Sequence, residues 1–110
     1  MKHDQIIDKL IGYTTKILDY CADEDYIHFS DNSLLVEACV FNLSQMGELA
    51  NKVDDSFKKM HPEIPWPELY GLRNRIVHDY EGVNLELVWE IIDGDLPNLL
   101  VALQSLSRSL

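Results

Sequence analysis

Apolar residues recur at intervals of three and four along most of the chain, and this periodicity restricts the fold more than any other feature. Between Asp4 and Tyr20 they form a single stripe, as expected for a helix with one buried face. Ser33 to Val53 carries two apolar stripes, which favours a central helix or a helix with one face in the core and one at a subunit contact. No segment alternates at the strand period, and no Asn-Gly or Asp-Gly turn lies between β-branched runs. The chain is therefore predicted to be all-α.

Polar and proline-rich segments separate these helices. Residues 22–32 form an acidic connection in which Asp31 or Asn32 is expected to cap the following helix. Residues 54–67 contain three prolines, which exclude a helix interior, so this segment is predicted to be a connection with at most one short turn.

The remainder predicts three more helices. The third runs from Pro67, which suits a first turn, to a C-terminal stop at Gly82. Asn84 is expected to cap the fourth, which Gly94 ends, and Asp95 to cap the fifth. Because the connections are short, residues 1–110 are predicted to form one domain, an antiparallel bundle of four to five helices.

Charge and composition narrow the class of protein. The 110 residues carry a net charge of −10, so nonspecific attraction to a polyanion would be weak. Five of the nine basic residues lie between Lys52 and Arg75, where a local nucleic-acid contact would have to form. There is no long apolar run and no signal-peptide pattern, and Cys21 and Cys39 are expected to be buried, reduced thiols. The expected location is the cytoplasm, without membrane association.

The stretch GLRNRIVHDYEG, residues 71–82, gathers two arginines, an asparagine, a histidine and a tyrosine on the predicted third helix. Asn74 and His78 are four apart and would share a face. Arg73 and His78 are five apart, which places them roughly 140° apart around a helix axis. Two solutions bring them together: the arginine side chain curls back, or a second copy of the helix across a two-fold axis completes the site.

These residue types suit cleavage of a phosphodiester by the RNA's own 2′-hydroxyl. A histidine that titrates near neutral pH serves as general acid or base, and arginine supplies a planar donor set for phosphate oxygens. The simpler structural interpretation is that Arg73 and Arg75 are solvated and pair with Glu68 or Asp79. Under that interpretation His78 is a half-buried histidine and Tyr80 a packing aromatic.

Other candidate residues carry less chemistry. Asp25-x-x-His28 resembles half of a carboxylate metal site, but it has no second copy, so a metal-dependent helical enzyme is the weakest of the hypotheses and no metal ligands are assigned. His61 precedes a proline in a connection, where a surface role is expected. Cys39 has no histidine nearby in the sequence and is not expected to act as a nucleophile.

From about Val40 to Leu100 the sequence resembles the HepT-like branch of the HEPN superfamily. The resemblance rests on MGELANKV, on HPEIPWPELYGLRNRIVHDYEGVNLELVWEIIDGDLPNLL and on one motif. In that motif an arginine and a polar residue (Arg73 and Asn74) are followed, after three more positions, by His78, any residue and Tyr80.

The resemblance implies a helical bundle that forms a homodimer with both motifs at one cleft. It implies a metal-independent endoribonuclease, without cofactor, that acts as the toxin of a toxin–antitoxin pair on an RNA such as tRNA or mRNA. Carried over by position, Arg73 stabilises phosphate charge, His78 is the acid or base, and Asn74 orients the phosphate or the histidine. Its partner would be an MNT-type nucleotidyltransferase antitoxin that attaches AMP to Tyr80. The alternative hypothesis is a non-catalytic helical subunit that binds and regulates such a nucleotidyltransferase.

Overall fold

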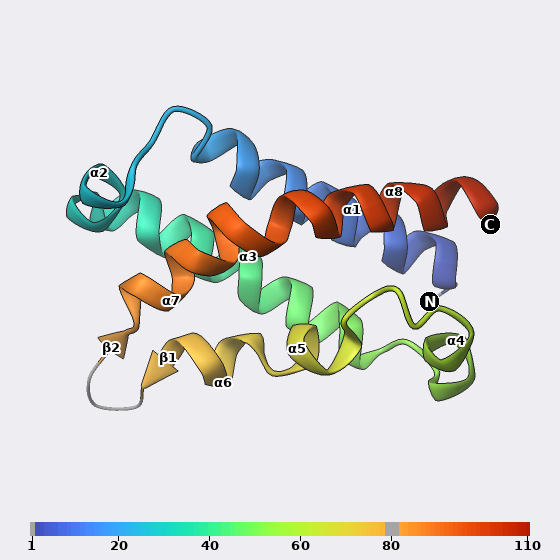
Figure 1. Ribbon diagram of the computed structural model, residues 1–110. Coiled ribbons are helices and arrows are strands. Elements are labelled where there is room, and N and C mark those ends of the chain that lie inside the picture. Colours follow the sequence, from blue (N-terminus) through green and yellow to red (C-terminus); the bar gives the residue numbers. More distant parts are fainter. Residues whose placement is uncertain (1, 79–81) are drawn as a thin grey trace.

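The computed structural model describes residues 2–78 and 82–110, and these residues are predominantly helical (Figure 1). The chain order is α1 (His3–Tyr20), α2 (Tyr26–Asp31), α3 (Ser33–Asn51), α4 (Asp55–Met60), α5 (Trp66–Tyr70), α6 (Leu72–Ile76), β1 (Val77–His78), β2 (Gly82–Val83), α7 (Leu85–Glu90), the π-helix η1 (Ile91–Asp95) and α8 (Leu96–Ser109). The all-α class is confirmed. The described residues divide into more and shorter helical segments than the four to five helices predicted.

Three long helices, α1, α3 and α8, form the main body of the molecule. Helix α1 packs against both α3 and α8, and it runs antiparallel to each of them, so the two termini lie at the same end (Figure 1). The stripe predicted on α1 is buried, including Ile6, Leu10 and Ile17, as are Leu43 of α3 and Leu103 of α8. These side chains belong to one continuous apolar core, which explains why the helical period was so clear in the sequence.

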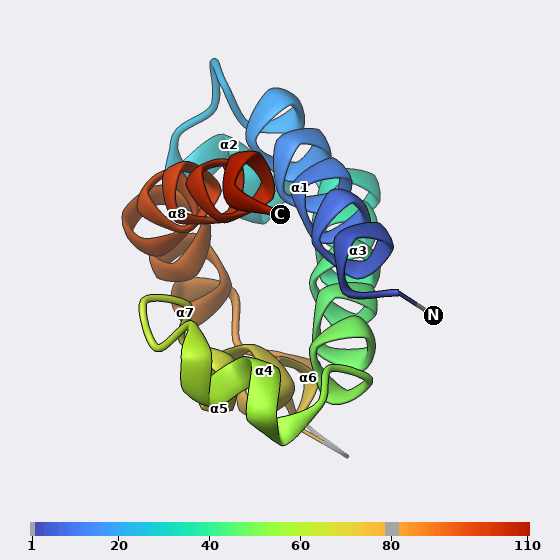
Figure 2. The same cartoon turned by 90° about the vertical axis from the view of Figure 1, so that its right-hand side faces the viewer.

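A separate arm, α4 to α6, crosses the molecule on the side opposite α1 and the C-terminal part of α8 (Figure 2). It is held by contacts of α5 and α6 with α3. At Gly47 of α3 the approach is close, because a Cβ atom there would lie 2.9 Å from the carbonyl oxygen of Leu69. The indole Nε1 of Trp66 donates to the carbonyl of His61 at 3.0 Å and fixes the proline-rich connection.

Two of the predicted helix caps are confirmed. The side-chain oxygen of Asn32 accepts from the backbone N–H of Leu35 at 3.1 Å, and that of Asn84 accepts from Leu87 at 3.2 Å. Both asparagines have extended backbone just before their helix. The acidic connection contains the extra helix α2, which packs against α7 partly through Phe29 and Trp89, whose ring centroids are 5.2 Å apart.

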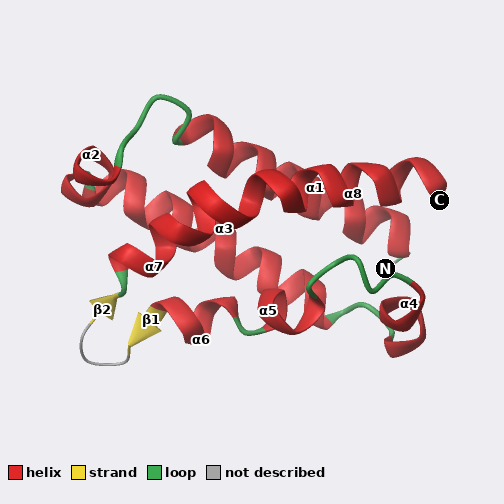
Figure 3. Ribbon diagram, viewed as in Figure 1, coloured by secondary structure: helices red, strands yellow, loops and turns green. Residues whose placement is uncertain are grey.

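The predicted third helix, Pro67 to Gly82, is wrong in its second half. Pro67 does lie in the first turn of α5, but Gly71 separates α5 from α6, and α6 ends at Ile76. Val77 is extended (φ −113°, ψ 123°), and the carbonyl of Ile76 accepts from the N–H of Asn84 at 2.8 Å. The chain then forms an antiparallel hairpin in which His78 pairs with Gly82 (Figure 3). Gly82 has φ +81° and is the first residue of β2, so it does not end a helix.

The predicted helix end at Gly94 is also wrong. Within the described residues Gly82 is the one glycine with positive φ, so Gly94 lacks the left-handed conformation that ends helices. The chain continues from α7 through the π-helix η1 into α8. Asp95 is helical (φ −98°, ψ −40°) and its side chain makes no capping hydrogen bond, so the predicted cap is wrong as well.

No helix in the described part of the chain is both long and apolar enough to span a membrane.

Candidate functional site

Helix α6 carries the first half of the candidate site. Its two ends are anchored by Leu72 and Ile76, which are 2% and 0% exposed and belong to the core. Between them Arg73, Asn74 and Arg75 are exposed. Packing of α6 against α3 therefore fixes a short rigid turn that presents two guanidinium groups and a carboxamide to solvent.

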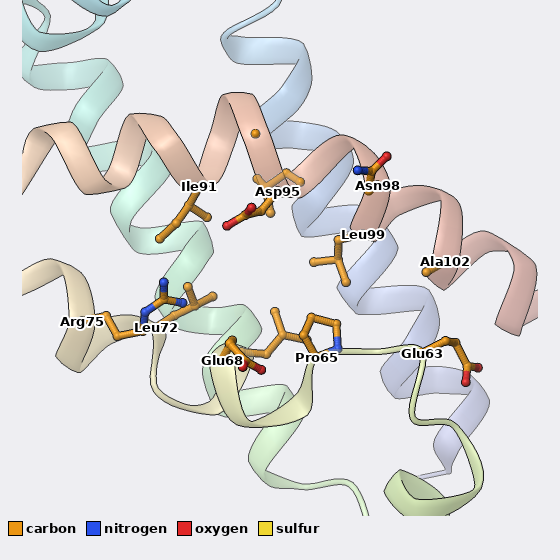
Figure 4. A pocket seen from close by; sticks show the side chains of 13 residues that line it. Glu63, Pro65, Glu68, Leu72, Arg75, Ile91, Asp95, Asn98, Leu99 and Ala102 are labelled. Carbon is orange, nitrogen blue, oxygen red and sulfur yellow. The ribbon is translucent and has the colours of Figure 1, made fainter.

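Arg73 and Arg75 point to different surfaces, because side chains two residues apart on a helix differ in direction by about 200° around the helix axis. Arg75 lines a groove between α5–α6 and η1–α8, together with Glu68 and Asp95 (Figure 4). Arg73 does not line this groove. Among the residues that the structure describes, neither arginine has a carboxylate oxygen within 4.0 Å, so the expected pairing of these arginines with Glu68 is not found.

The second half of the site begins where α6 ends. His78 follows in β1, with its backbone opposite Gly82. The angle of roughly 140° between Arg73 and His78 assumed one continuous helix; it does not apply, because the extended Val77 intervenes. Tyr80, the predicted modification site, and Asp79 lie outside the described residues.

Arg73 and Asn74 together have the chemistry of a phosphate-binding pair. A guanidinium is charged at any physiological pH and donates in a planar fork, while a carboxamide both donates and accepts. Because both side chains are exposed and their backbone is held by buried neighbours, a phosphodiester can reach them without rearrangement of the core.

Asp25 and His28, the weak metal candidate, have a structural role. Oδ1 of Asp25 accepts from the backbone N–H of His28 at 2.9 Å and caps α2, and the same oxygen lies 2.7 Å from His28 Nδ1. The backbone hydrogen bond, followed by the side-chain one, lowers the pKa of Asp25. The side-chain hydrogen bond to Asp25 raises the pKa of His28. In the described part of the chain no three metal-binding side chains cluster.

The two cysteines, far apart in sequence, are neighbours in space. Both are buried free thiols, as predicted, and their Sγ atoms lie 3.6 Å apart between the end of α1 and α3. Their hydrogen bond lowers the pKa of Cys21 and raises that of Cys39, which burial raises further. Cys39 has no exposed surface, so direct attack on a polymer substrate is excluded.

His61, expected at the surface, is partly covered by an aromatic cluster. Its ring lies 4.5 Å from that of Phe57, which in turn lies 4.2 Å from the ring of His3. His61 Nδ1 is 3.4 Å from Glu63 Oε1, and His3 Nε2 is 3.2 Å from Asp54 Oδ2. These contacts join the start of α1 to the α4 region.

The groove beside Arg75 was not predicted from the sequence. Its upper wall in Figure 4 includes Asp95 and Asn98, and its lower wall includes Glu68 and Arg75. The groove was missed because a helix end was predicted at Gly94, which assigned Ile91 and Asp95 to different helices. If residues 91–102 are taken as one helix, a single face carries four of the groove residues: Ile91, Asp95, Asn98 and Ala102. This spacing is the sequence signal from which the groove wall could have been predicted.

Comparison with known proteins defines the class. The family model described as "Ribonuclease HepT-like" matches residues 10–106, which is most of the chain. The chain therefore belongs to the ribonuclease HepT-like family. The family predicted from the motif around Arg73 is confirmed, and with it the enzyme class, ribonuclease, at the level of the family.

Individual relatives agree with this class. "Putative RNase MJ1380" of Methanocaldococcus jannaschii is 31% identical over 83 residues, which cover 76% of each chain. "Probable ribonuclease HepT" of Thermococcus cleftensis is 36% identical over 62 residues, 56% of each chain. "Putative RNase TTE0752" of Caldanaerobacter subterraneus subsp. tengcongensis is 34% identical over 71 residues, covering 64% of this chain and 63% of the relative. No solved structure matches the chain.

Proposed function

We propose that this protein is a metal-independent endoribonuclease that uses Arg73, Asn74 and His78. The observation that carries the proposal is the exposed Arg73–Asn74 pair, held on α6 between two buried anchors and three residues before the strand that contains His78. Membership of the ribonuclease HepT-like family supports it.

The reaction proposed is attack of a ribose 2′-hydroxyl on the adjacent phosphorus. A base takes the hydroxyl proton, the bond from the 2′-oxygen to phosphorus forms, and the bond from phosphorus to the 5′-oxygen breaks. The leaving 5′-oxygen receives a proton from an acid, which yields a 2′,3′-cyclic phosphate and a 5′-hydroxyl. His78 is the base or the acid, and Arg73 holds the charge that builds on the phosphate oxygens. Asn74 orients the phosphate or the imidazole.

A homodimer would bring two copies of this motif to one cleft, one supplying Arg73 and the other His78. The exposed side of α3 supports this arrangement, since Leu34 and Phe41 are 76% and 60% exposed and stand two helical turns apart. These two residues lie outside both apolar stripes predicted from the sequence, and the second of those stripes is directed into the core through Val36 and Leu43. Light scattering should give a dimer, with Phe41→Glu monomeric and Glu37→Gln unchanged.

Regulation by a nucleotidyltransferase antitoxin that attaches AMP to Tyr80 is part of the same proposal. The added phosphate, two residues from His78, would repel RNA and fill the cleft. The second candidate function, a non-catalytic subunit that binds such an enzyme, is favoured by one observation. The net charge of −10 opposes binding of long RNA.

The deciding experiment is an RNA cleavage assay with chelator present. Wild-type protein should cut RNA, leave DNA of the same sequence intact and lose its activity in His78→Ala. Equal cleavage by purified wild type and His78→Ala would refute the assignment of His78. A folded wild type that binds a nucleotidyltransferase but cuts no RNA at equimolar enzyme would support the second function.

A further inference from the structure

A groove separates the α5–α6 arm from the continuous η1–α8 helix (Figure 4). We call it the α6–α8 groove, and its volume is about 460 Å³. Glu63, Glu68 and Arg75 stand on one wall, and Asp95, Asn98 and Ala102 on the other. Arg73 and Asn74 of the proposed cleavage site do not line the groove.

The groove is elongated along a helix. Ile91, Asp95, Asn98 and Ala102 occur at intervals of four, three and four residues, so one face of η1–α8 forms a whole wall. The eleven steps from Ile91 to Ala102, at about 1.5 Å each, give a wall of about 16 Å. In Figure 4 Ile91 and Arg75 mark one end, and Ala102 and Glu63 the other. Such a shape suits a helical segment lying beside α8.

The charge of the groove is negative. Among the described residues that line it, Glu63, Glu68 and Asp95 contribute three carboxylates and Arg75 one guanidinium. In the described part of the chain none of these carboxylates forms an ion pair with Arg75 within 4.0 Å. The only ion pair here within the described residues is that of Glu63 with His61. A cationic occupant would therefore meet Glu68 and Asp95, which form no ion pair among the described residues.

The floor of the groove is apolar. Leu69, Leu72 and Leu99 line it, and each is also part of the core. Pro65 and Ala102 add apolar surface at the walls, and both are more exposed than the leucines. An apolar floor between charged rims is the arrangement that binds an amphipathic helix, whose apolar side chains enter while its charged residues reach the rim.

We propose that the α6–α8 groove binds a basic amphipathic helix of a partner protein. A second copy of this chain is not assigned to the groove, because the homodimer proposed above uses the exposed side of α3. RNA is disfavoured because phosphates would meet the carboxylates at the rim. The proposal does not depend on RNA cleavage, because Arg73 and Asn74 do not line the groove.

The test uses a synthetic helix of about fourteen residues built from leucine and lysine, which spans about 21 Å, and the same peptide with glutamate replacing lysine. Each is titrated into isotope-labelled full-length protein while backbone amide signals are followed by NMR. The basic peptide should shift the signals of residues 65–75 and 91–102, and the acidic peptide should leave them unchanged. Binding should weaken with added salt.

Two pairs of matched variants locate the contact. Ala102→Phe should fill the groove and weaken binding about tenfold or more, whereas Val101→Phe, at a position 63% exposed and outside the groove, should not. Glu68→Gln with Asp95→Asn should weaken binding, whereas Glu37→Gln with Glu48→Gln on α3 should not. The cleavage assay on each variant is a separate readout, so loss of binding and loss of RNA cleavage are distinguishable.

Three results would overturn the proposal. In the first, both phenylalanine variants or both charge pairs weaken binding equally, which indicates nonspecific attraction. In the second, a short RNA shifts the groove signals in place of the basic peptide. In the third, Ala102→Phe dissociates a dimer that Val101→Phe leaves intact, which makes a second copy the occupant.

Discussion

Arg73 and Arg75 share one turn of α6 and one chemistry, but they face different surroundings. Only Arg75 lines the groove beside Glu68 and Asp95. Arg73→Ala should reduce RNA cleavage by about a hundredfold or more, the usual loss for a donor to developing negative charge. Arg75→Ala should retain cleavage within a few-fold of wild type. Initial rates on one RNA under single-turnover conditions measure both.

Arg73→Lys adds a stricter control, because it keeps the charge and removes the planar fork. Partial activity in this variant would assign the main effect to charge, and activity near that of Arg73→Ala would assign it to two-point contact. Equal losses in Arg73→Ala and Arg75→Ala would contradict the division of roles, and would indicate that the arginines act together through nonspecific attraction to RNA.

The Asp25–His28 pair gives a prediction on pH. The raised pKa of His28 contributes stability below the unfolded pKa, and this contribution disappears as pH rises through the folded value. The lowered pKa of Asp25 contributes stability at pH values above its unfolded pKa, and this stability is lost as pH falls through the folded pKa. In an NMR titration His28 should titrate above an ordinary histidine, and Asp25→Asn should reverse this. Asp23→Asn, the control, should not, and a His28 pKa unmoved by Asp25→Asn would refute the contact.

Cys21 and Cys39 are close enough to predict a reaction. With hydrogen peroxide, the Cys21 thiolate, favoured by its lowered pKa, takes one oxygen and releases water, and Cys39 then displaces that oxygen as a second water. The product is a disulfide between the end of α1 and α3. Intact mass should fall by two hydrogen atoms, reversibly with a reductant. Cys21→Ser should show no such loss, and wild type that only gains oxygen would contradict the prediction.

The position of α5 and α6, which carry part of the candidate site, depends on Gly47 of helix α3. At Gly47 an added Cβ would lie 2.9 Å from the Leu69 carbonyl, and a backbone atom cannot move aside as a side chain does. Gly47→Ala should therefore push α5 and α6 away from α3 and cost about 1–3 kcal/mol of unfolding free energy. Thermal unfolding measures the cost and the RNA assay its effect. Gly12→Ala, with nothing within 4 Å, is the matched control and should not destabilise.

The long helices were predictable because their apolar pattern repeats over several turns. Helices α1 and α3 each carry several turns of apolar periodicity, and Asn32 and Asn84 mark helix starts with side chains that do cap. Arg73 and Asn74 are proposed site residues on the basis of the motif, and both are exposed on α6, as a substrate contact would require.

Short elements and helix ends were not predictable, because they depend on contacts distant in sequence. Val77 is extended where the backbone carbonyl of Ile76 accepts a hydrogen bond from the N–H of Asn84. This hydrogen bond joins residues eight apart, so the local sequence pattern does not predict it. Strands of two residues are too short to show alternation. A glycine that adopts positive φ, such as Gly82, and one that does not, such as Gly94, look alike in sequence. The groove was missed for this last reason.

At the scale of the whole molecule, the two arginines of α6 lie on different surfaces. Arg73 stands outside the groove, whereas Arg75 lines it with three carboxylates, those of Glu63, Glu68 and Asp95. An acidic nuclease therefore needs only a small neutral or basic contact for its substrate, and its acidic surfaces remain available to a partner protein. The net charge of −10 is in this view a property of partner recognition.

The proposed two-chain site predicts that two inactive variants can restore activity when they form a mixed dimer. Arg73→Ala and His78→Ala homodimers should each be inactive, but a mixed dimer retains one Arg73 and one His78 in the shared cleft. After the two variants are unfolded together and refolded, RNA cleavage should rise well above the sum of the separate proteins. Mixing Arg73→Ala with the Arg73→Ala/His78→Ala double variant should restore nothing, because no Arg73 remains. If the first mixture also stays inactive while mass spectrometry shows mixed dimers, both residues must act from the same chain, and the site is complete in one copy.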